Sequence, residues 1–298
     1  MGITLTLTGH QTDLGGGFVV RRMLPAAARQ SVGPFIFFDH FGPVVQPPSM
    51  NTDVRPHPHI GLATVTYLYE GAMMHRDNLG TVQRIEPGAI NWMSAGRGIV
   101  HSERTPDDLK QADRRTHGLQ LWVALPRDQE ESAPTFAHTP AERIPELVVE
   151  GARVRVLVGT AWGLTSPVQP LSPTLYLDIK LAPGQSLTLP KLAEEAALYA
   201  IDQALTLDGE AVAPHTMVVL GDEGAGLLSN SADTEASLVI IGGAPLDGHR
   251  FIWWNFVSTQ KERIAQAAQD WDNGLFKSVP GDDQERIDLP AKRPYQQA

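Results

Sequence analysis

The chain has 298 residues, with 34 acidic and 24 basic side chains and a formal net charge of −10 at pH 7. This charge argues against direct wrapping of nucleic acid, because neutralising phosphates requires a surplus of lysine and arginine on one face. There is no cysteine, which excludes disulfide scaffolds, thiolate zinc sites, iron–sulfur clusters and cysteine nucleophiles. The length predicts about two domains of roughly 150 residues each.

The first residues predict a strand rather than a targeting segment. Ile3, Leu5 and Leu7 alternate with threonines, which is the period of a half-buried strand. The start has neither the basic residues nor the apolar run of a signal peptide. No stretch of the chain approaches the ~18–20 apolar residues that a spanning helix needs. We therefore expect a cytoplasmic protein without membrane contact.

Short strands separated by glycine turns are expected through the first half. Glycines stand at positions 61, 71, 80, 88, 96 and 98, and β-branched and aromatic stretches lie between them. These stretches predict strands over 64–69, 81–85 and 89–93. Such regular spacing is typical of an all-β sandwich or barrel.

A linker is predicted where the composition changes. Residues 127–146 are polar and include Pro134, Pro140 and Pro145, and prolines remove ladder donors and favour extended chain. We predict an N-terminal domain at 1–130, a linker at 131–146 and a C-terminal domain at 147–298.

The second half repeats the strand pattern over 153–158, 174–181, 197–201, 217–220 and 237–241. Residues 67–73 faintly resemble 199–205 at an offset of 132, which favours a duplicated β-domain.

One helix is predicted near the C-terminus. Thr259 and Glu262 have the spacing of a capping box, and apolar residues recur at helical spacing from Ile264 to Trp271. The Asn-Gly pair at 273–274 predicts its end. We expect the apolar stripe of this helix to pack on a sheet.

His57 and His59 form a first pair of candidate metal ligands. They are two residues apart, so on an extended strand both side chains point to one face. Their Cα atoms would lie about 6.7 Å apart at a rise of ~3.3 Å per residue, and two imidazoles can converge on one ion across that gap. The flanking Pro56 and Pro58 suit an edge strand.

His101 and Glu103 form a second pair, again on one face of a predicted strand. The 42 residues from His59 to His101 amount to about four strand lengths at eight to ten residues each, enough to fold the chain back so that the two pairs face each other across the inside of a small barrel. A buried histidine or glutamate without a partner is costly, and one ion would serve all four side chains. The alternative is a polar strand with surface histidines.

The donor set restricts the ion without choosing it. Nitrogen and oxygen ligands without thiolate admit Fe, Mn, Co, Ni, Cu or Zn. A six-coordinate ion such as Fe(II) would keep two positions open after four protein ligands, which suits oxygen chemistry. Two other histidines each have two possible roles. His75 either hydrogen-bonds within a loop or contacts a ligand, and His117 is either structural or orients a metal ligand.

Several long segments carry a resemblance to a known family. They are PHPHIGLATVTYLYEG, MHRDNLGTVQRIEPGAINWMSAGRGIVHSE and HGLQLWVALP, with DLGGGFVVRR and FFDHFGP before them and IGGAPLDGHRFIWWNF after them. Together they resemble the pirin family of the cupin superfamily. The resemblance implies a bicupin, with two cupin-type double-stranded β-helix barrels. It further implies one metal ion, usually iron, bound in the first barrel by His57, His59, His101 and Glu103.

The resemblance also implies two alternative roles. Some members resemble quercetin 2,3-dioxygenases, or quercetinases, whereas animal members act as iron-dependent transcriptional co-regulators. We therefore predict an oxidoreductase, an iron-dependent dioxygenase that opens the ring of a flavonol such as quercetin with O₂. Glu103 would bind the metal and accept the flavonol hydroxyl proton. The alternative is a non-catalytic, redox-dependent binding module that docks on a partner protein, which the negative charge fits better than bare DNA.

The second barrel is expected to lack metal ligands. No H-x-H occurs after residue 105. Adding the repeat offset of 132 to positions 57, 59 and 101 gives Leu189, Lys191 and Asp233, which do not form a ligand set.

Overall fold

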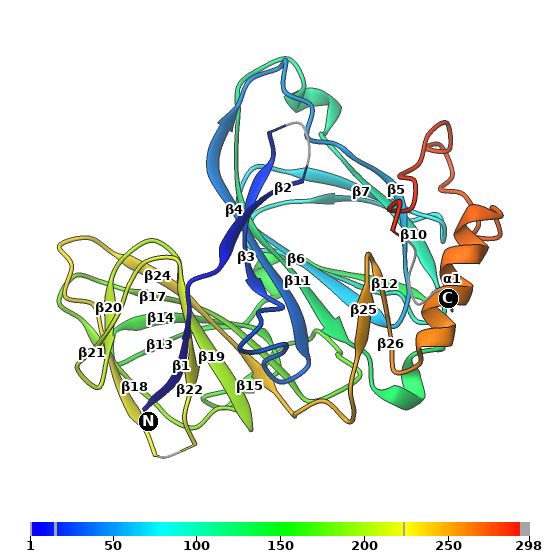
Figure 1. Ribbon diagram of the computed structural model, residues 1–298. Helices are drawn as coiled ribbons and strands as arrows, with labels where there is room; N and C mark the ends of the chain where they lie inside the picture. The colour runs from blue at the N-terminus through cyan, green and yellow to red at the C-terminus, as the bar shows by residue number, and fades with distance from the viewer. Residues whose placement is uncertain (1, 15–16, 223, 293–298) are drawn as a thin grey trace. The chain divides into compact units, whose positions relative to one another are not determined.

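The structure, a computed structural model, describes residues 2–14, 17–222 and 224–292 (Figure 1). Its contacts divide the chain into two units. The first unit holds residues up to 11, 21–39 and 139–245, and the second holds 12–20, 40–138 and those from 246 onward. The divisions near residues 20 and 39 fall inside strands β3 (Val19–Leu24) and β4 (Phe35–Gln46).

Most of a seven-stranded sheet, together with a four-stranded sheet, forms the second unit. The larger has the order β12-β9-β6-β11-β4-β3-β2 and the smaller β5-β10-β7-β8. Phe41 and Leu68 of the larger sheet pack with Ile85 of the smaller, so the two sheets face each other across a common core. The strands not yet given are β2 (His10–Asp13), β5 (Val54–His59), β6 (Leu62–Glu70), β7 (Met73–Asp77), β8 (Val82–Ile85), β9 (Ile90–Ser94), β10 (Ile99–Arg104), β11 (Arg114–Ala124) and β12 (Thr135–Thr139).

The first unit is built in the same way. Its seven-stranded sheet has the order β1-β22-β19-β24-β17-β14-β13, and its four-stranded sheet has the order β18-β23-β20-β21. Aliphatic side chains of both sheets form one buried cluster. The strands are β1 (Ile3–Leu7), β13 (Glu146–Val149), β14 (Ala152–Val158), β17 (Thr174–Leu181), β18 (Ser186–Leu189), β19 (Glu195–Ala200), β20 (Leu205–Leu207), β21 (Glu210–Val212), β22 (Thr216–Leu220), β23 (Gly226–Ser229) and β24 (Ala236–Gly243).

The two strand orders repeat each other. β5, β10, β7 and β8 take the places in one small sheet that β18, β23, β20 and β21 take in the other. This repetition confirms the prediction of an all-β protein with two barrels. The constant offset of 132 is wrong for one strand, because it carries position 101 to Asp233, beyond the end of β23. The connections between strands differ in length in the two units, so no single offset can apply.

The segment predicted as a linker has structure of its own. It contains the edge strand β12 and the short helix η3 (Ala141–Arg143), and its three prolines flank these elements rather than interrupt them. The domain limits 1–130 and 147–298 stay a prediction. The remaining short elements are η1 (Asp107–Leu109), η2 (Arg127–Gln129), and the hairpins β15 (Thr160–Ala161) with β16 (Leu164–Thr165) and β25 (Phe251–Trp253) with β26 (Phe256–Ser258).

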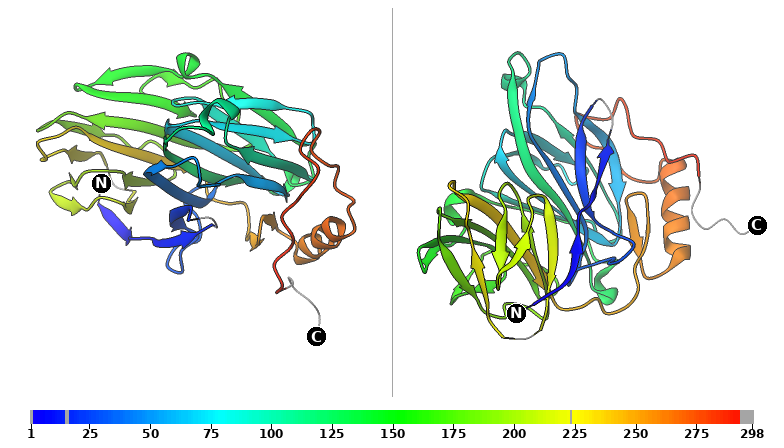
Figure 2. Two further views of the ribbon diagram at one scale, coloured as in Figure 1. Left: turned by 90° about the horizontal axis from the view of Figure 1, so that it is seen from above. Right: turned by 60° about the vertical axis from the view of Figure 1, so that its left-hand side comes forward.

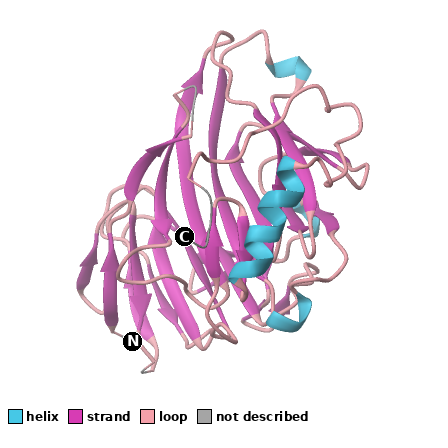
Figure 3. Ribbon diagram, turned by 45° about the vertical axis from the view of Figure 1, so that its right-hand side comes forward, coloured by secondary structure: helices cyan, strands magenta, loops and turns pink. Residues whose placement is uncertain are grey.

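The predicted C-terminal helix is confirmed as α1 (Lys261–Asp272) (Figure 3). Ile264 and Trp271 on its apolar stripe pack with Ile60 and Phe256, and Figure 2 shows the helix beside the β25–β26 hairpin. The predicted capping box is wrong: the N-cap is Gln260, with no side-chain cap. No described helix has the length and apolar character needed to cross a bilayer.

Candidate metal centre

Strands β5 and β10 bring the two predicted ligand pairs together. They are antiparallel neighbours in which His57 lies opposite His101 and His59 lies opposite Ile99. β5 is an edge strand of its sheet, which accommodates Pro56 and Pro58, since an edge strand can lack ladder donors. The imidazoles of His57, His59 and His101 are buried, with 6 %, 2 % and 2 % of their residues' surface exposed.

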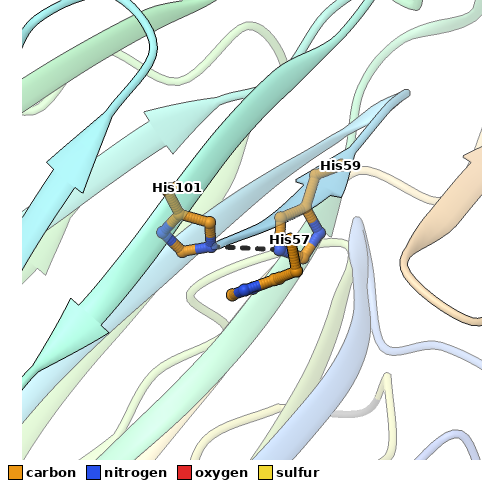
Figure 4. Close-up of side chains that lie close together, drawn as sticks. All are labelled: His57, His59 and His101. Atoms are coloured by element: carbon orange, nitrogen blue, oxygen red, sulfur yellow. Dashed lines mark hydrogen bonds between the residues drawn. The ribbon is translucent and has the colours of Figure 1, made fainter. Parts of the chain in front are cut away.

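The three imidazoles converge on one point (Figure 4). One ring nitrogen from each of His57, His59 and His101 lies within 4.8 Å of the others. Nε2 of His59 and Nε2 of His101 are 3.1 Å apart. Among the residues that the structure describes, this is the one group of three or more histidines or carboxylates with the spacing of a metal site.

Hydrogen bonds and rings on the outer side orient two of these imidazoles. The backbone carbonyl of Arg55 accepts a hydrogen bond of 2.8 Å from Nδ1 of His57, which leaves Nε2 of His57 as a lone-pair donor. The ring of Trp122 packs edge-on against His59 with centroids 5.4 Å apart. No group lies within hydrogen-bonding distance and angle of Nδ1 of His59.

Burial keeps the three imidazoles neutral. It lowers the pKa of His57 to about 4, against a smaller opposing effect of the Arg55 carbonyl. It also holds the pKa values of His59 and His101 well below the usual range, with the neighbouring His57 adding to the shift. The backbone of Asn255 favours the charged form of His59 but does not offset burial. Neutral imidazoles are the form that binds transition metals.

Glu103, the fourth predicted ligand, is on the correct strand but outside the group of three. The register of β10 against β5 shifts between His101 and Glu103, while on the other side Glu103 lies opposite His75 of β7. The side chain is half-buried, and desolvation raises its pKa to about 7.

His75 and Asp77 are buried beside the three imidazoles, and Asp77 was not among the predicted site residues. His75 lies on β7, so its expected position in a loop is wrong. Nδ1 of His75 is 3.3 Å from Nδ1 of His101, and Nε2 of His75 is 3.0 Å from Oδ2 of Asp77. Their two-residue spacing on an extended segment, the same signal as in His57 and His59, could have identified this pair.

His117 lies outside this group. Its Nε2 is 2.9 Å from Nε2 of His40, and its ring packs on Tyr69. These contacts favour the structural interpretation of His117 over a direct role in orienting a metal ligand.

The matching strands of the other unit carry leucine. The fully buried side chains of β18 are Leu187 and Leu189, that of β23 is Leu228, and those of β20 are Leu205 and Leu207. All five belong to the hydrophobic cluster of that unit. Leucine has no atom that can bind a metal. The matching positions therefore offer nitrogen ligands in one barrel and only hydrocarbon side chains in the other.

The residues present fit a transition metal. Three neutral imidazoles with nitrogens this close have few other ways to satisfy buried lone pairs, and leaving them unpaired is costly. Imidazole suits zinc, copper, iron and nickel, and three protein ligands leave positions for further donors.

Comparison with known proteins gives a consistent assignment. Residues 17–123 match the family model for Pirin, and residues 176–277 match that for the Pirin C-terminal cupin domain. A pirin-like protein of Caulobacter vibrioides is 41% identical over 97% of this chain and 99% of its own length. The crystal structure of a quercetin 2,3-dioxygenase from Acinetobacter baumannii has a TM-score of 0.90 and 32% identity, covering 99% of this chain and 97% of the other. A bacterial pirin from Escherichia coli, solved in complex with nickel(II), has a TM-score of 0.62 and 17% identity, covering 81% and 99%.

Proposed function

The chain belongs to the pirin family, and on that premise we propose that it is an iron-dependent dioxygenase acting on a flavonol such as quercetin. The observation that carries the proposal is the convergence of three buried, neutral imidazole nitrogens inside one barrel. The relative from Acinetobacter baumannii, named as a quercetin 2,3-dioxygenase, supports the reaction class because it covers nearly the whole chain at 32% identity.

In this proposal His57, His59 and His101 hold the ion, and Glu103 is the fourth ligand. A bound iron(II) supplies a redox centre for O₂ and a positive charge for an enolate oxygen. One carboxylate among four ligands offsets half of the charge of a divalent ion, which three neutral imidazoles alone cannot do.

The protein residues then have separate tasks. Glu103 would also accept the hydroxyl proton of the flavonol, since a carboxylate within hydrogen-bond reach of that hydroxyl can act as a general base. Trp122, which packs against His59, offers an aromatic wall beside the ligands. Burial of the three imidazoles limits access of water to the ion.

The test is turnover by reconstituted protein. Metal-free protein is loaded with Fe(II) under nitrogen, and quercetin and then O₂ are added while oxygen consumption and carbon monoxide are measured. Uptake of O₂ with release of carbon monoxide, lost in His101→Ala, supports the proposal. Nickel(II), the ion of the Escherichia coli relative, is tested alongside Mn, Co and Cu, and absence of turnover with every one of these ions contradicts the proposal.

Ion binding without turnover would support the alternative function, a redox-dependent binding module. That role predicts that the Fe(II) and Fe(III) forms differ in affinity for a partner protein.

A further inference from the structure

A buried hydrogen-bonded chain runs from Asp77 through His75 to His101. Oδ2 of Asp77 is 3.0 Å from Nε2 of His75, and Nδ1 of His75 is 3.3 Å from Nδ1 of His101. The three residues are exposed by 1 %, 2 % and 2 %, so water does not compete for these contacts. The chain reaches the side of the His101 ring opposite to Nε2, the atom that faces His59.

The surroundings of Asp77 set the direction of the whole chain. Oδ1 of Asp77 accepts hydrogen bonds from the backbone N–H groups of Leu79 and Thr81, at 2.9 and 3.0 Å. A carboxylate can only accept, so Nε2 of His75 carries the proton and donates to Oδ2. With this single proton on its ring, His75 has a lone pair on Nδ1, which accepts the N–H of Nδ1 of His101. Nε2 of His101 is left as a lone pair toward the metal centre.

Packing holds the middle of the chain in place. The ring of Phe136 stacks on His75 with centroids 4.3 Å apart and planes inclined by 20°. This contact restricts rotation of the His75 ring about its side-chain bonds, so its two nitrogens stay aligned with Asp77 and His101.

The other barrel offers an internal comparison. Its strand β20, which takes the place of β7, has Leu205 and Leu207 as its buried residues. In this other barrel, the strands that match β5 and β10 also carry buried leucines where the first has histidines. The polar chain is therefore present in the barrel that has the three imidazoles and is absent, together with them, from the described residues of the other.

We propose that Asp77 and His75 are positioning residues that hold His101 in the tautomer with Nδ1 protonated and Nε2 available as a metal ligand. This inference rests on the proposed function in one respect, namely that the three imidazoles bind an ion. Such outer partners of metal-bound histidines typically contribute 10–100-fold to metal affinity.

Asp77→Asn gives a sharp test, because it reverses the chain. The carbonyl oxygen of the new side-chain amide remains the acceptor for the two backbone N–H groups, so its NH₂ group faces His75 and donates to Nε2. His75 must then donate from Nδ1, which requires a lone pair on Nδ1 of His101 and moves the His101 proton to Nε2. Long-range ¹H–¹⁵N correlation spectra of metal-free protein distinguish these two tautomers directly. We expect the Nδ1–H form in the unmodified protein and the Nε2–H form in Asp77→Asn.

Affinity for Ni²⁺, measured by competition with a chromophoric chelator, gives the second readout. Asp77→Asn is expected to weaken Ni²⁺ binding by roughly 10–100-fold. His75→Phe, which keeps a ring to stack on Phe136, is expected to weaken it similarly. Asp208→Asn is the matched control: Asp208 accepts the backbone N–H of Leu227 at 2.7 Å in the other barrel, between β20 and β21, and its substitution should leave Ni²⁺ affinity unchanged.

The two readouts separate this inference from the proposed function. An unchanged His101 tautomer in Asp77→Asn, or Ni²⁺ affinity equal to that of Asp208→Asn, overturns the inference. Failure of the unmodified protein to bind Ni²⁺ or Fe²⁺ overturns the metal site itself, and the tautomer spectra still decide whether Asp77 orients His101.

Discussion

Nε2 of His59 and Nε2 of His101 face each other at 3.1 Å, although the two residues are 42 positions apart in the chain. Both side chains are buried, and burial lowers the pKa of each. Two neutral imidazoles at this distance must share either a proton or a cation, because two facing lone pairs repel each other. With His57 completing the group, a shared cation explains the arrangement of all three.

Removing one imidazole should abolish tight ion binding. His101→Ala takes away a ligand itself, so its effect on Ni²⁺ affinity should exceed the roughly 10–100-fold typical of outer partners. The metal content of purified protein, measured by mass spectrometry, should fall from about one ion per chain to a trace. His10→Ala, at an exposed position, should retain its metal, and equal metal content in both variants would contradict the ligand assignment.

Glu103 should destabilise the metal-free protein above neutral pH. Its pKa is about 7 in the folded protein against 4.5 ordinarily, so the folded state binds the proton more tightly. The stabilisation from this proton is complete below pH 4.5 and is lost as the pH rises through 7.

The corresponding variant is Glu103→Gln in the presence of a chelator. The quantity to compare is the unfolding free energy of Glu103→Gln minus that of the unmodified protein. Between pH 4.5 and pH 8 this difference should rise by up to about 3 kcal/mol, at 1.36 kcal/mol per pKa unit. Partial exposure of the side chain reduces this figure. Urea titrations across this range measure the gain, and Glu210→Gln, at an exposed site on β21, should show none. A pH-independent difference would contradict the raised pKa.

Gly61, directly after the His57–His59 strand, should not tolerate a side chain. Its φ is +69°, and a Cβ there would clash with the backbone oxygen of Val257. We expect Gly61→Ala to cost roughly 3–5 kcal/mol, among the largest single-residue effects. Gly80→Ala has a similar positive φ but open space, so it should cost only about 1–2 kcal/mol. Equal losses in the two variants, measured by chemical denaturation, would show that the backbone contact is unimportant.

Glu130 should be required for stability. Its carboxylate accepts hydrogen bonds from Oγ of Ser258 and the backbone N–H of Thr259, both at 3.0 Å, and it lies 3.1 Å from Nε of buried Arg250. Glu130→Gln leaves the Arg250 charge paired with Asp247 alone, at a cost of about 3 kcal/mol.

The neighbouring Glu131 supplies the control for that experiment. It pairs with Arg263 at 2.7 Å, but 58 % of its side chain is exposed. Glu131→Gln should therefore change the unfolding free energy by less than about 1 kcal/mol. A comparable loss in both variants would contradict the importance of burial at Glu130.

The strands and the first ligands could be predicted because their signals are local. The two-residue spacing of His57 and His59 fixes a common face, and β17 begins and ends at the residues that the pattern indicated. The pairing of β5 with β10 was not predicted: the chain length indicated only that the two ligand pairs could face each other across a barrel, whereas they lie on neighbouring strands of one sheet.

Other features depend on tertiary contacts that the sequence does not display. Thr259 has the spacing of a capping box, yet its hydroxyl and N–H bond to Glu130, 129 residues away. His75 looked like a loop residue because Met74 and Arg76 around it give no alternation of apolar side chains, while β7 is held by its partners β10 and β8.

X-ray absorption spectroscopy of protein loaded with one equivalent of iron shows whether one ion binds to His57, His59 and His101. We expect one ion per chain, with three imidazole nitrogens in its first coordination shell at about 2.1 Å. A protein that retains no ion, or an ion whose first shell lacks imidazole, would contradict this expectation.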